Sequence, residues 1–371
     1  MTIQSPILSV IVPAHDCAEP LRRCLDALAA SELPRERWEL IVVDDASQDD
    51  TAIVAARYAD LVVRLPGRPL GPEYARNRGV ELSRGELLAF VSADVCPKPD
   101  ALSGFIRALG NPTVGAVNGV YEYARGGNLL TDFQALYNQF VRDRAAGEVD
   151  AFFSGFGAIR RSVLASVGGF DEWSKNRPRV AAVELGQRIR ALGDRVLLDA
   201  GIRAIHLKRR SLAQMLQQTL RDHGVPYEEH ATPPAEAVND GLRWVRRRER
   251  ATPVLCWTAV DCLALALFGR GGIWVWFILA GAVAGLTVLN APFYAFAARQ
   301  RGAARLFSVV PLHFVGSMLV GTARLTDRVL RGLVGEPRPD PAIEAFAEVG
   351  LNTWPPVPIR RAPLASQSPG A

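Results

Sequence analysis

The fold is decided by the apolar run Ile7-Leu8-Ser9-Val10-Ile11-Val12, which stops at Pro13 and is followed by an amphipathic segment from Pro20 to Ala30. An apolar run, a polar loop and an amphipathic segment indicate a strand, a loop and a helix. Because this order recurs downstream, we predict an α/β fold with a mostly parallel sheet flanked by helices. The expected strands are 38–43, 61–64, 86–92, 115–123, 152–159 and 196–198, and the expected helices are 50–58, 71–83, 129–144 and 183–192.

Composition divides the chain into parts. Its 371 residues are 49% hydrophobic, which excludes a disordered chain and allows a complete α/β core with further segments attached. The apolar excess lies after residue 252, whereas the first 225 residues resemble an ordinary α/β domain in composition. We therefore expect a globular domain at 1–225, a basic juxtamembrane linker at 226–252, a membrane region at 253–331 and a proline-rich tail at 332–371.

The membrane region contains three apolar segments. From Gly272 to Ala298 there are 27 residues without a charge, more than the roughly 20 that cross a hydrocarbon core. The segment from Pro253 to Phe268 is shorter and contains Asp261, and the segment from Leu306 to Ala323 contains a proline and a histidine. We expect two or three apolar helices in a membrane. The alternative is a buried helical hairpin in a soluble protein.

Arginines around these segments predict their orientation. The cluster Arg243, Arg246, Arg247, Arg248 and Arg250 lies on the cytoplasmic side under the positive-inside rule. A hairpin across 269–271 returns the basic positions 299, 301 and 305 to the same side. We therefore expect a multi-pass protein of the cell membrane with its first domain in the cytoplasm. A third full span would place the arginines at 324, 328 and 331 outside, so that segment is alternatively interfacial or re-entrant.

Carboxylates follow two of the predicted strands. Asp44 and Asp45 end the second strand, at the sheet edge where open α/β sheets bind ligands, and could accept hydrogen bonds from a nucleobase or a ribose. The alternative is that nearby polar residues merely cap the next helix. Asp94 follows another apolar run, where a carboxylate can hold a divalent cation against a diphosphate. The capping candidates are Ser47, Asp49 and Asp50.

A helix start at Gly71-Pro72 precedes Arg76, Asn77 and Arg78. The positive end of a helix together with two arginines predicts a diphosphate site, and the alternative is a surface helix with solvated arginines. The chain lacks both the G-x-G-x-x-G and the G-x-x-x-x-G-K-[ST] motif, which argues against dinucleotide-dependent dehydrogenases and P-loop enzymes.

Taken together, the motifs between about residues 7 and 222 resemble family 2 glycosyltransferases of the GT-A fold. Their order and spacing make the joint match specific, although each is modest alone. The segments 184–189 and 206–209 are similar to a membrane-attached branch of that family. The matching motifs are Ser9–Asp16, Val43–Ser47, Ala75–Gly79, Phe90–Asp94, Gly155–Arg161 and Gly168–Glu172.

The resemblance implies a transferase that uses a nucleotide-diphosphate sugar together with Mg²⁺ or Mn²⁺. It assigns the metal to Asp94 and His206, and the nucleobase to Asp45. Attachment to a membrane favours a lipid-linked or polyprenyl-type acceptor, and no nucleic acid partner is expected. The residues expected to bind the nucleotide sugar are Pro13, His15, Asp44, Asp45, Arg76, Asn77, Ser92 and Ala93.

Two departures from the family pattern bear on activity. The usual Asp-x-Asp is Ser92-Ala93-Asp94, and the usual Glu-Asp pair with the general base falls on Ala181-Ala182. Glu184 is the nearest carboxylate and the substitute base, although helical spacing turns it about 200° from position 182. Loss of a base typically costs about 10²- to 10⁴-fold in rate.

We therefore expect a membrane-anchored inverting glycosyltransferase. The alternative is a catalytically impaired homologue that acts as a sugar-nucleotide-binding or scaffold protein at the membrane. A nucleotidyltransferase on a related sheet is disfavoured, because that class has a glycine-rich signature near the first strand.

Overall fold

The computed structural model describes residues 6–123, 129–172, 178–207, 240–270 and 272–334. The first part of the predicted linker, as far as residue 239, and the tail after residue 334 lie outside these ranges. The described chain forms two compact units that alternate along the sequence. We call them the sheet unit, residues 6–118 and 151–196, and the helical unit, residues 119–150 and 197–334.

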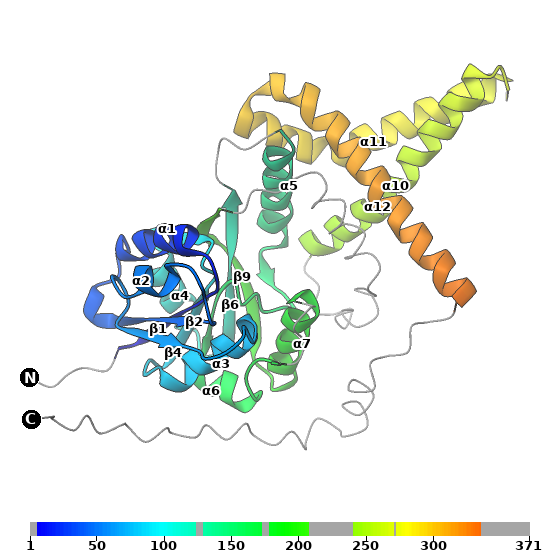
Figure 1. Ribbon diagram of the computed structural model, residues 1–371. Helices are drawn as coiled ribbons and strands as arrows, with labels where there is room; N and C mark the ends of the chain where they lie inside the picture. Colours follow the sequence, from blue (N-terminus) through cyan, green and yellow to red (C-terminus); the bar gives the residue numbers. More distant parts are fainter. Residues whose placement is uncertain (1–5, 124–128, 173–177, 208–239, 271, 335–371) are drawn as a thin grey trace, which may run out of the picture. The chain divides into compact units, whose positions relative to one another are not determined.

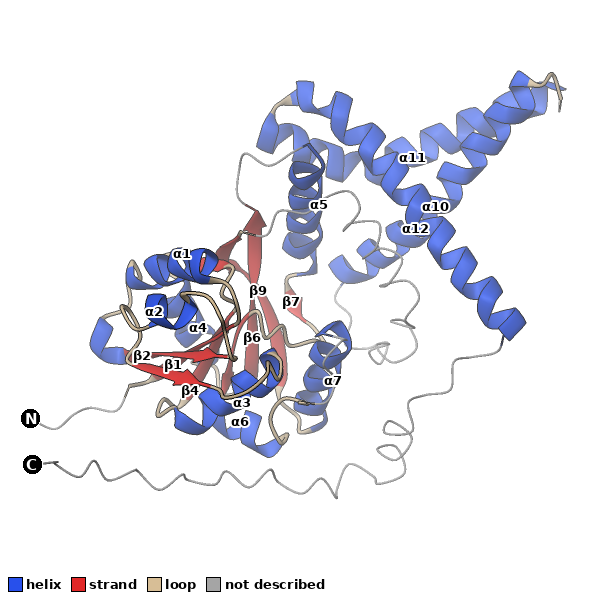
Figure 2. Cartoon of the chain, viewed as in Figure 1, coloured by secondary structure: helices blue, strands red, loops and turns tan. Residues whose placement is uncertain are grey.

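The strands of the sheet unit form a mixed sheet (Figures 1 and 2). They are β1 (Leu8–Ala14), β2 (Trp38–Asp44), β3 (Leu61–Arg64), β4 (Leu87–Val91), β5 (Val95–Pro97), β6 (Val114–Tyr123, as far as residue 118) and β8 (Phe156–Arg160). Their order includes β3-β2-β1-β4-β8-β6. The first four are parallel, whereas β8 is antiparallel to β4 and to β6. The predicted α/β fold with a mostly parallel sheet is confirmed. The antiparallel direction of β8 was not predicted, because uniformly buried apolar runs do not reveal strand direction.

Helices cover both faces of this sheet. They are α1 (Ala18–Ala29), α2 (Thr51–Ala55), α3 (Pro72–Leu82), α4 (Ala101–Leu109), α6 (Arg161–Ser166) and α7 (Pro178–Ala191). In Figure 1, α1, α2 and α4 lie on one side of the strands and α3 and α6 on the other. The first helix forms because Leu21, Leu25 and Leu28 recur at helical spacing and are buried.

Two neighbouring arginines at the end of β8 hold the carboxyl ends of two helices. Arg161 donates to the carbonyl of Val80 and the hydroxyl of Ser83 at the end of α3. Arg160 donates to the carbonyl of Leu109 at the end of α4. Cations are favoured at helix carboxyl ends, so this pair fixes both helices to the sheet.

The helical unit contains the described elements α5 (Leu129–Ala145), β7 (Gly147–Glu148), β9 (Arg195–His206, from residue 197), α10 (Asp240–Leu267), α11 (Gly272–Arg301) and α12 (Leu306–Val334). Three helices are long and apolar enough to cross a membrane, over Arg247–Leu267, Gly272–Arg301 and Ala303–Thr322. The three predicted apolar segments are therefore helices. The basic stretch 243–250 belongs to α10 itself, because that helix begins at Asp240 and continues through Pro253.

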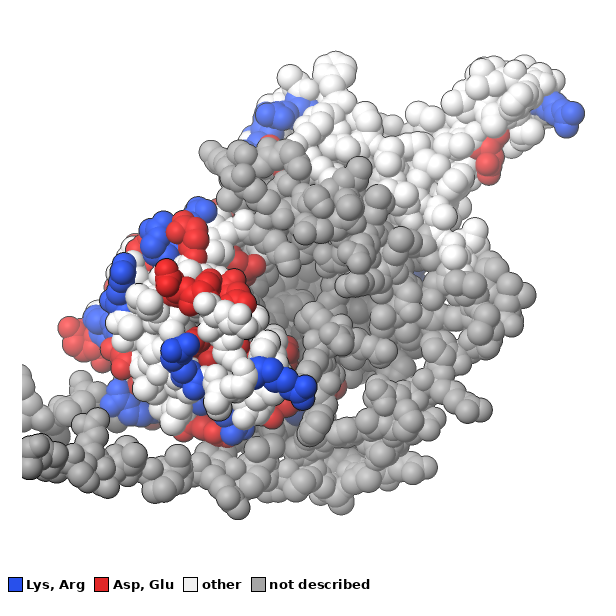
Figure 3. Space-filling view, viewed as in Figure 1, with Lys and Arg blue, Asp and Glu red and all other residues white. Residues whose placement is uncertain are grey.

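The apolar helices leave large side chains exposed. Phe268, Trp274 and Phe307 are 81%, 72% and 90% exposed. In Figure 3 the charged residues of this unit gather at the ends of the visible helices, with uncharged surface between them. Exposed apolar surface of this kind disfavours a buried hairpin in a soluble protein.

Helix α5 forms the core of the helical unit with α11 and α12. Phe133, Leu136 and Phe140 pack against Phe293, Ala297 and Val309. Arg248 of α10 is 1% exposed, and its guanidinium carbon lies 5.0 Å from the ring centroid of Tyr137. The sequence placed α5 within the domain 1–225 and placed Arg248 at a membrane surface. The structure instead buries both in one cluster of aromatic rings.

Candidate functional site

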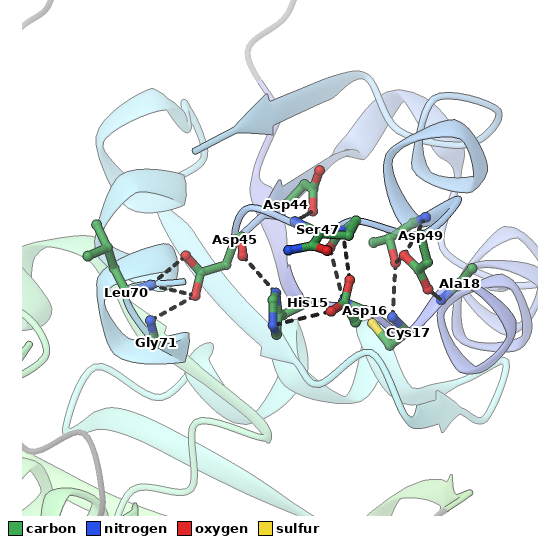
Figure 4. A network of polar contacts seen from close by, with 12 residues as sticks. His15, Asp16, Cys17, Ala18, Asp44, Asp45, Ser47, Asp49, Leu70 and Gly71 are labelled. Carbon is green, nitrogen blue, oxygen red and sulfur yellow. Dashed lines mark hydrogen bonds and ion pairs between the residues drawn. The ribbon is translucent and has the colours of Figure 1, made fainter. Parts of the chain in front are cut away.

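The candidate site lies at the carboxyl edge of β1 and β2 (Figure 4). The loops after these strands contain two non-glycine residues with positive φ, Asp16 at 43° and Ala46 at 58°. The His15 ring donates from Nδ1 to the carbonyl of Asp45 at 2.8 Å. The backbone amide of Asp16 donates to Ser47 Oγ at 3.0 Å, so the two loops are joined. Strained residues of this kind often occur at functional sites.

His15 is the predicted site residue that is best placed to contact a ligand. A carbonyl oxygen only accepts, so Nδ1 carries a proton, and Nε2 is the ring nitrogen that faces away from this bond. Nε2 lies 3.6 Å from a carboxylate oxygen of Asp16, and both side chains are more than two-fifths exposed. This edge can therefore offer an imidazole and a carboxylate to a polar ligand.

Asp44 and Asp45 are buried at 0% and 4% exposure. Asp44 accepts from the amide of Ser47 at 3.1 Å and from Arg64 Nε at 3.2 Å. Asp45 accepts from the amides of Leu70 and Gly71 (Figure 4). The predicted nucleobase ligand is thus engaged by the protein backbone in this structure.

Of the three residues predicted as possible helix caps, Asp49 is the one whose side chain caps a helix. Its carboxylate accepts from the amide of Thr51 at the start of α2 and from the amide of Ala18 at the start of α1. Asp50 occupies the N-cap position of α2 without a side-chain hydrogen bond, and Ser47 joins the two loops. One carboxylate therefore stabilises two helix starts.

Arg76 and Asn77 of α3 face the interior of the sheet unit. Arg76 is 5% exposed, and its Nη1 lies 3.2 Å from a Glu73 oxygen. Asn77 donates to the carbonyl of Phe170 at 2.9 Å and accepts from the amide of Phe170 at 3.1 Å. Asn77 also donates to Glu172 Oε1 at 2.8 Å. These groups hold the turn 168–172 against α3, so a diphosphate contact by them stays a prediction.

The predicted metal ligands fall in different units. Asp94 is half-buried between β4 and β5 in the sheet unit, next to Ser92 and the buried Ala93. His206 ends β9 in the helical unit, with its ring edge-on to Tyr121 at 5.2 Å. Within the described ranges, no three His, Cys, Asp or Glu side chains form a metal site. A single carboxylate still fits an ion that is bound largely by substrate phosphates, as Mg²⁺ often is.

The substitute base Glu184 forms a two-point ion pair with Arg188 on α7, with contacts of 2.6 and 2.9 Å. Arg188 also donates to the carbonyls of Val167 and Gly169. Burial raises the pKa of the Glu184 carboxyl above its ordinary value, and Arg188 opposes part of that shift. Ala181 and Ala182 lie in the same helix. Pro13, the remaining predicted site residue, is buried in β1 opposite Val43.

The sequence did not predict that the backbone amides of Leu70 and Gly71 bind Asp45, or that Asn77 forms hydrogen bonds with the backbone of Phe170. A signal for the first existed in Gly71-Pro72, because Gly71 has a φ of 106° that only glycine adopts readily. No signal for the second existed, because 93 positions separate its partners.

Comparisons with known proteins bear on the sheet unit. Residues 9–168 match the family model described as glycosyl transferase family 2. Glycosyltransferase AglE of Haloferax volcanii is 30% identical over 181 residues, 46% of this chain and 58% of that protein. The probable glycosyltransferase YdaM of Bacillus subtilis is 28% identical over 183 residues, 45% of this chain and 43% of that protein. The chain thus spans about half the length of the curated relatives it matches.

Among solved structures, the mannosyltransferase PcManGT from Pyrobaculum calidifontis, in complex with GDP-Man and Mn²⁺, aligns with a TM-score of 0.49. It is 20% identical, and the alignment covers 90% of this chain and 88% of that one. At this similarity the alignment says nothing of substrate or metal. The family match and the named relatives agree with each other: residues 9–168 of this chain are similar to glycosyltransferase family 2.

Proposed function

We propose that the protein transfers a sugar from a nucleotide-diphosphate sugar to a lipid-linked acceptor at a membrane. The observation that carries the proposal is the combination, in one chain, of a family 2 glycosyltransferase sheet with three exposed apolar helices. The first supplies a fold for a nucleotide sugar, and the second supplies a place where a lipid acceptor resides.

The donor binds at the carboxyl edge of β1, β2 and β4 in this proposal. His15 Nε2 and the exposed Asp16 carboxylate are available there for polar groups of the nucleotide or the sugar. Asp94 would hold Mg²⁺ or Mn²⁺ here, and such an ion would supply positive charge to balance that of the departing diphosphate. His206, of the helical unit, would be the second metal ligand in this proposal.

The membrane part follows from the exposed apolar helices. Two or three of them span the bilayer, with the arginines that precede the first span, at 243 and 246, on the cytoplasmic side. This orientation keeps the sheet unit in the cytoplasm, where nucleotide sugars are present. A polyprenyl-type acceptor then presents its head group at the membrane surface.

In the reaction an acceptor oxygen attacks the anomeric carbon, the bond from that carbon to the diphosphate oxygen breaks, and the nucleoside diphosphate leaves. A hydroxyl acceptor must also lose a proton, and Glu184, the described carboxylate nearest to Ala182 in sequence, is paired with Arg188. A lipid phosphate presents an oxygen that is already ionised and needs no base. The acceptor that best fits this chain is therefore a polyprenyl phosphate.

A second candidate, a catalytically impaired homologue, is favoured by Ala181-Ala182 and by Ser92 in place of family carboxylates. Such a protein would bind a sugar nucleotide, or act as a scaffold, without turnover.

The test uses the full chain in lipid nanodiscs with Mg²⁺ or Mn²⁺ and UDP-, GDP- and dTDP-sugars. Polyprenyl phosphate and a lipid-linked sugar with a free hydroxyl serve as the two acceptors. Transfer to the phosphate by the unaltered protein supports the proposal and contradicts the impaired homologue. Binding without turnover, rescued by the double change Ala181→Glu and Ala182→Asp, would establish the impaired homologue. Absence of nucleotide binding in every version would overturn both.

A further inference from the structure

The turn between α11 and α12 carries a concentration of positive charge. Arg299 and Arg301 lie in the last turn of α11, and Arg305 ends the short 3₁₀ helix η2 (Ala303–Arg305) that leads into α12 (Figure 1). The chain changes direction at Gly302, whose φ of 84° is readily adopted only by glycine. Three arginines therefore lie within seven consecutive positions.

The three arginines differ in their partners. Arg301 is 23% exposed, and its Nη2 lies 3.6 Å from Asp132 Oδ1 on α5. The side chains of Arg299 and Arg305 are exposed and form no hydrogen bond or ion pair with any residue that the structure describes. Asp132 thus offsets the charge of Arg301, and the two exposed arginines remain available to an outside partner.

The length of α11 gives the depth of this turn in a bilayer. The helix has 30 residues, which is about 45 Å at a rise of about 1.5 Å per residue. A bilayer measures about 30 Å across its hydrocarbon core and about 40 to 45 Å with its head groups. A helix of this length that crosses the bilayer reaches from one head-group layer to the other. Its last residues, and the turn that follows, therefore lie at the level of the lipid phosphates.

Apolar side chains next to the arginines complete this surface. Phe307 follows Arg305 by two positions and is 90% exposed, and Val310 is 38% exposed. An exposed aromatic ring beside arginines is typical of the membrane–water interface, where the ring enters the lipid and the cation stays with the head groups. The turn thus presents positive charge and apolar surface side by side.

We propose that the turn 299–307 binds the phosphate groups of anionic phospholipids, through Arg299 and Arg305, with Phe307 in the adjoining acyl layer. The inference rests on the membrane part of the proposed function and does not require sugar transfer. A guanidinium group matches a phosphate with its fork of N–H donors, and an anionic leaflet attracts each such side chain. The turn at the other end of α11 offers one arginine, Arg270, so the two ends of this helix differ in their charge.

The first experiment measures lipid affinity of the full chain in a nonionic detergent, by native mass spectrometry with phosphatidylglycerol or phosphatidylcholine of equal chain length. The unaltered protein should prefer phosphatidylglycerol. The double variant Arg299→Gln, Arg305→Gln should bind it about 25-fold more weakly, about fivefold for each charge, and should bind phosphatidylcholine as before.

A second double variant, Arg107→Gln with Arg270→Gln, is the matched control. It removes the same charge from two other exposed arginines, one on α4 and one at the opposite end of α11. Its affinity for phosphatidylglycerol should stay within threefold of the unaltered value. Equal losses in both double variants would show that net charge alone governs binding, and would overturn the inference.

The second experiment locates the lipid and identifies the source of the phosphate. A photoreactive phosphatidylglycerol in nanodiscs that hold the full chain should label peptides containing residues 299–307, and Arg299→Gln, Arg305→Gln should remove this label. Neither inorganic phosphate at constant ionic strength nor an equal amount of polyprenyl phosphate should displace the label. Displacement by the first would make the turn a site for free phosphate, and displacement by the second would make it part of an acceptor site. Either result would overturn the inference.

Retention in the bilayer separates this inference from the proposed function. A chain that is not retained in nanodiscs overturns both the membrane part of that function and the lipid surface. A retained chain that binds the two phospholipids equally overturns the lipid surface alone. A retained chain that prefers phosphatidylglycerol but transfers no sugar overturns the transferase and supports the lipid surface.

Discussion

The sheet unit and the helical unit use their buried charges in different ways. In the sheet unit, Asp45 and Arg161 form hydrogen bonds with backbone groups at loop and helix ends. In the helical unit, Arg248 lies among the rings of Tyr137, Phe140 and Phe293, at 5.0 to 5.9 Å from their centroids. The first arrangement fixes loops at the edge of a site. The second attaches α5 to the apolar helices by cation–π contacts and packing.

The largest expected effect tests whether the two units are stabilised separately. Phe90 and Phe293 are each 0% exposed, one in each unit. Truncation of either to alanine should cost about 3 to 5 kcal/mol, because it removes a buried ring and leaves a cavity. Amide exchange measured segment by segment should show faster opening of β1, β2 and β4 in Phe90→Ala, and of α5 and α11 in Phe293→Ala. Equal acceleration in both units from either change would mean that they unfold as one.

A smaller effect is expected from Arg161→Met. This change keeps much of the side-chain volume but removes the Arg161 bonds to the carbonyl of Gly85, to the carbonyl of Val80 and to the hydroxyl of Ser83. Loss of these charged hydrogen bonds should cost about 2 kcal/mol, measured as a lower melting temperature and faster exchange at the end of α3. An unchanged melting temperature would contradict the capping role.

The matched substitution in the helical unit is Arg248→Met. It removes the cation–π contacts and the hydrogen bond with Tyr137, and the saved cost of burying a charge offsets these losses. The expected change in stability is within about 1 kcal/mol. A loss as large as that from Arg161→Met would show that the contrast between the units is wrong.

The sequence predicted most elements of the sheet unit because each depends on local patterns. The predicted strand 38–43 and helix 71–83 differ from β2 and α3 by a residue at their ends. The placement of α5 could not be predicted, because its aromatic partners lie more than 100 positions away on α11 and α12. Periodicity indicates that a face is buried but not what covers it.

The sequence predicted which residues belong to the candidate site but not the hydrogen bonds among them. Acidic residues at the ends of β2 and β4 were found, because strand ends are visible as breaks in apolar runs. That Asp45 binds the amides of Leu70 and Gly71 depends on how a loop returns to the sheet, which no local pattern specifies. The same limit applies to Asn77 and Phe170.

The smallest expected effect is a change of stability with pH that depends on Glu184. It tests whether this side chain only forms an ion pair with Arg188 or also acts as a base. Burial raises the pKa of Glu184 above its ordinary value of 4.5, so the folded protein binds this proton more tightly than the unfolded chain. The stability of the sheet unit should therefore fall as pH rises through that window, by less than about 1 kcal/mol because the side chain is partly exposed. Glu184→Gln should abolish this pH-dependent loss of stability, measured by melting curves taken between about pH 4.5 and pH 7.

The same variant separates the two acceptor chemistries. If Glu184 only pairs with Arg188, transfer to a lipid phosphate stays within a few-fold of the unaltered rate. If it deprotonates a hydroxyl acceptor, the rate falls by about 10²- to 10⁴-fold while the melting temperature hardly changes. Glu184→Asp provides the control, because a shortened carboxylate keeps its charge but cannot reproduce both contacts with Arg188. Partial recovery of transfer to the hydroxyl by that variant would assign the base to this position and contradict an ionised acceptor.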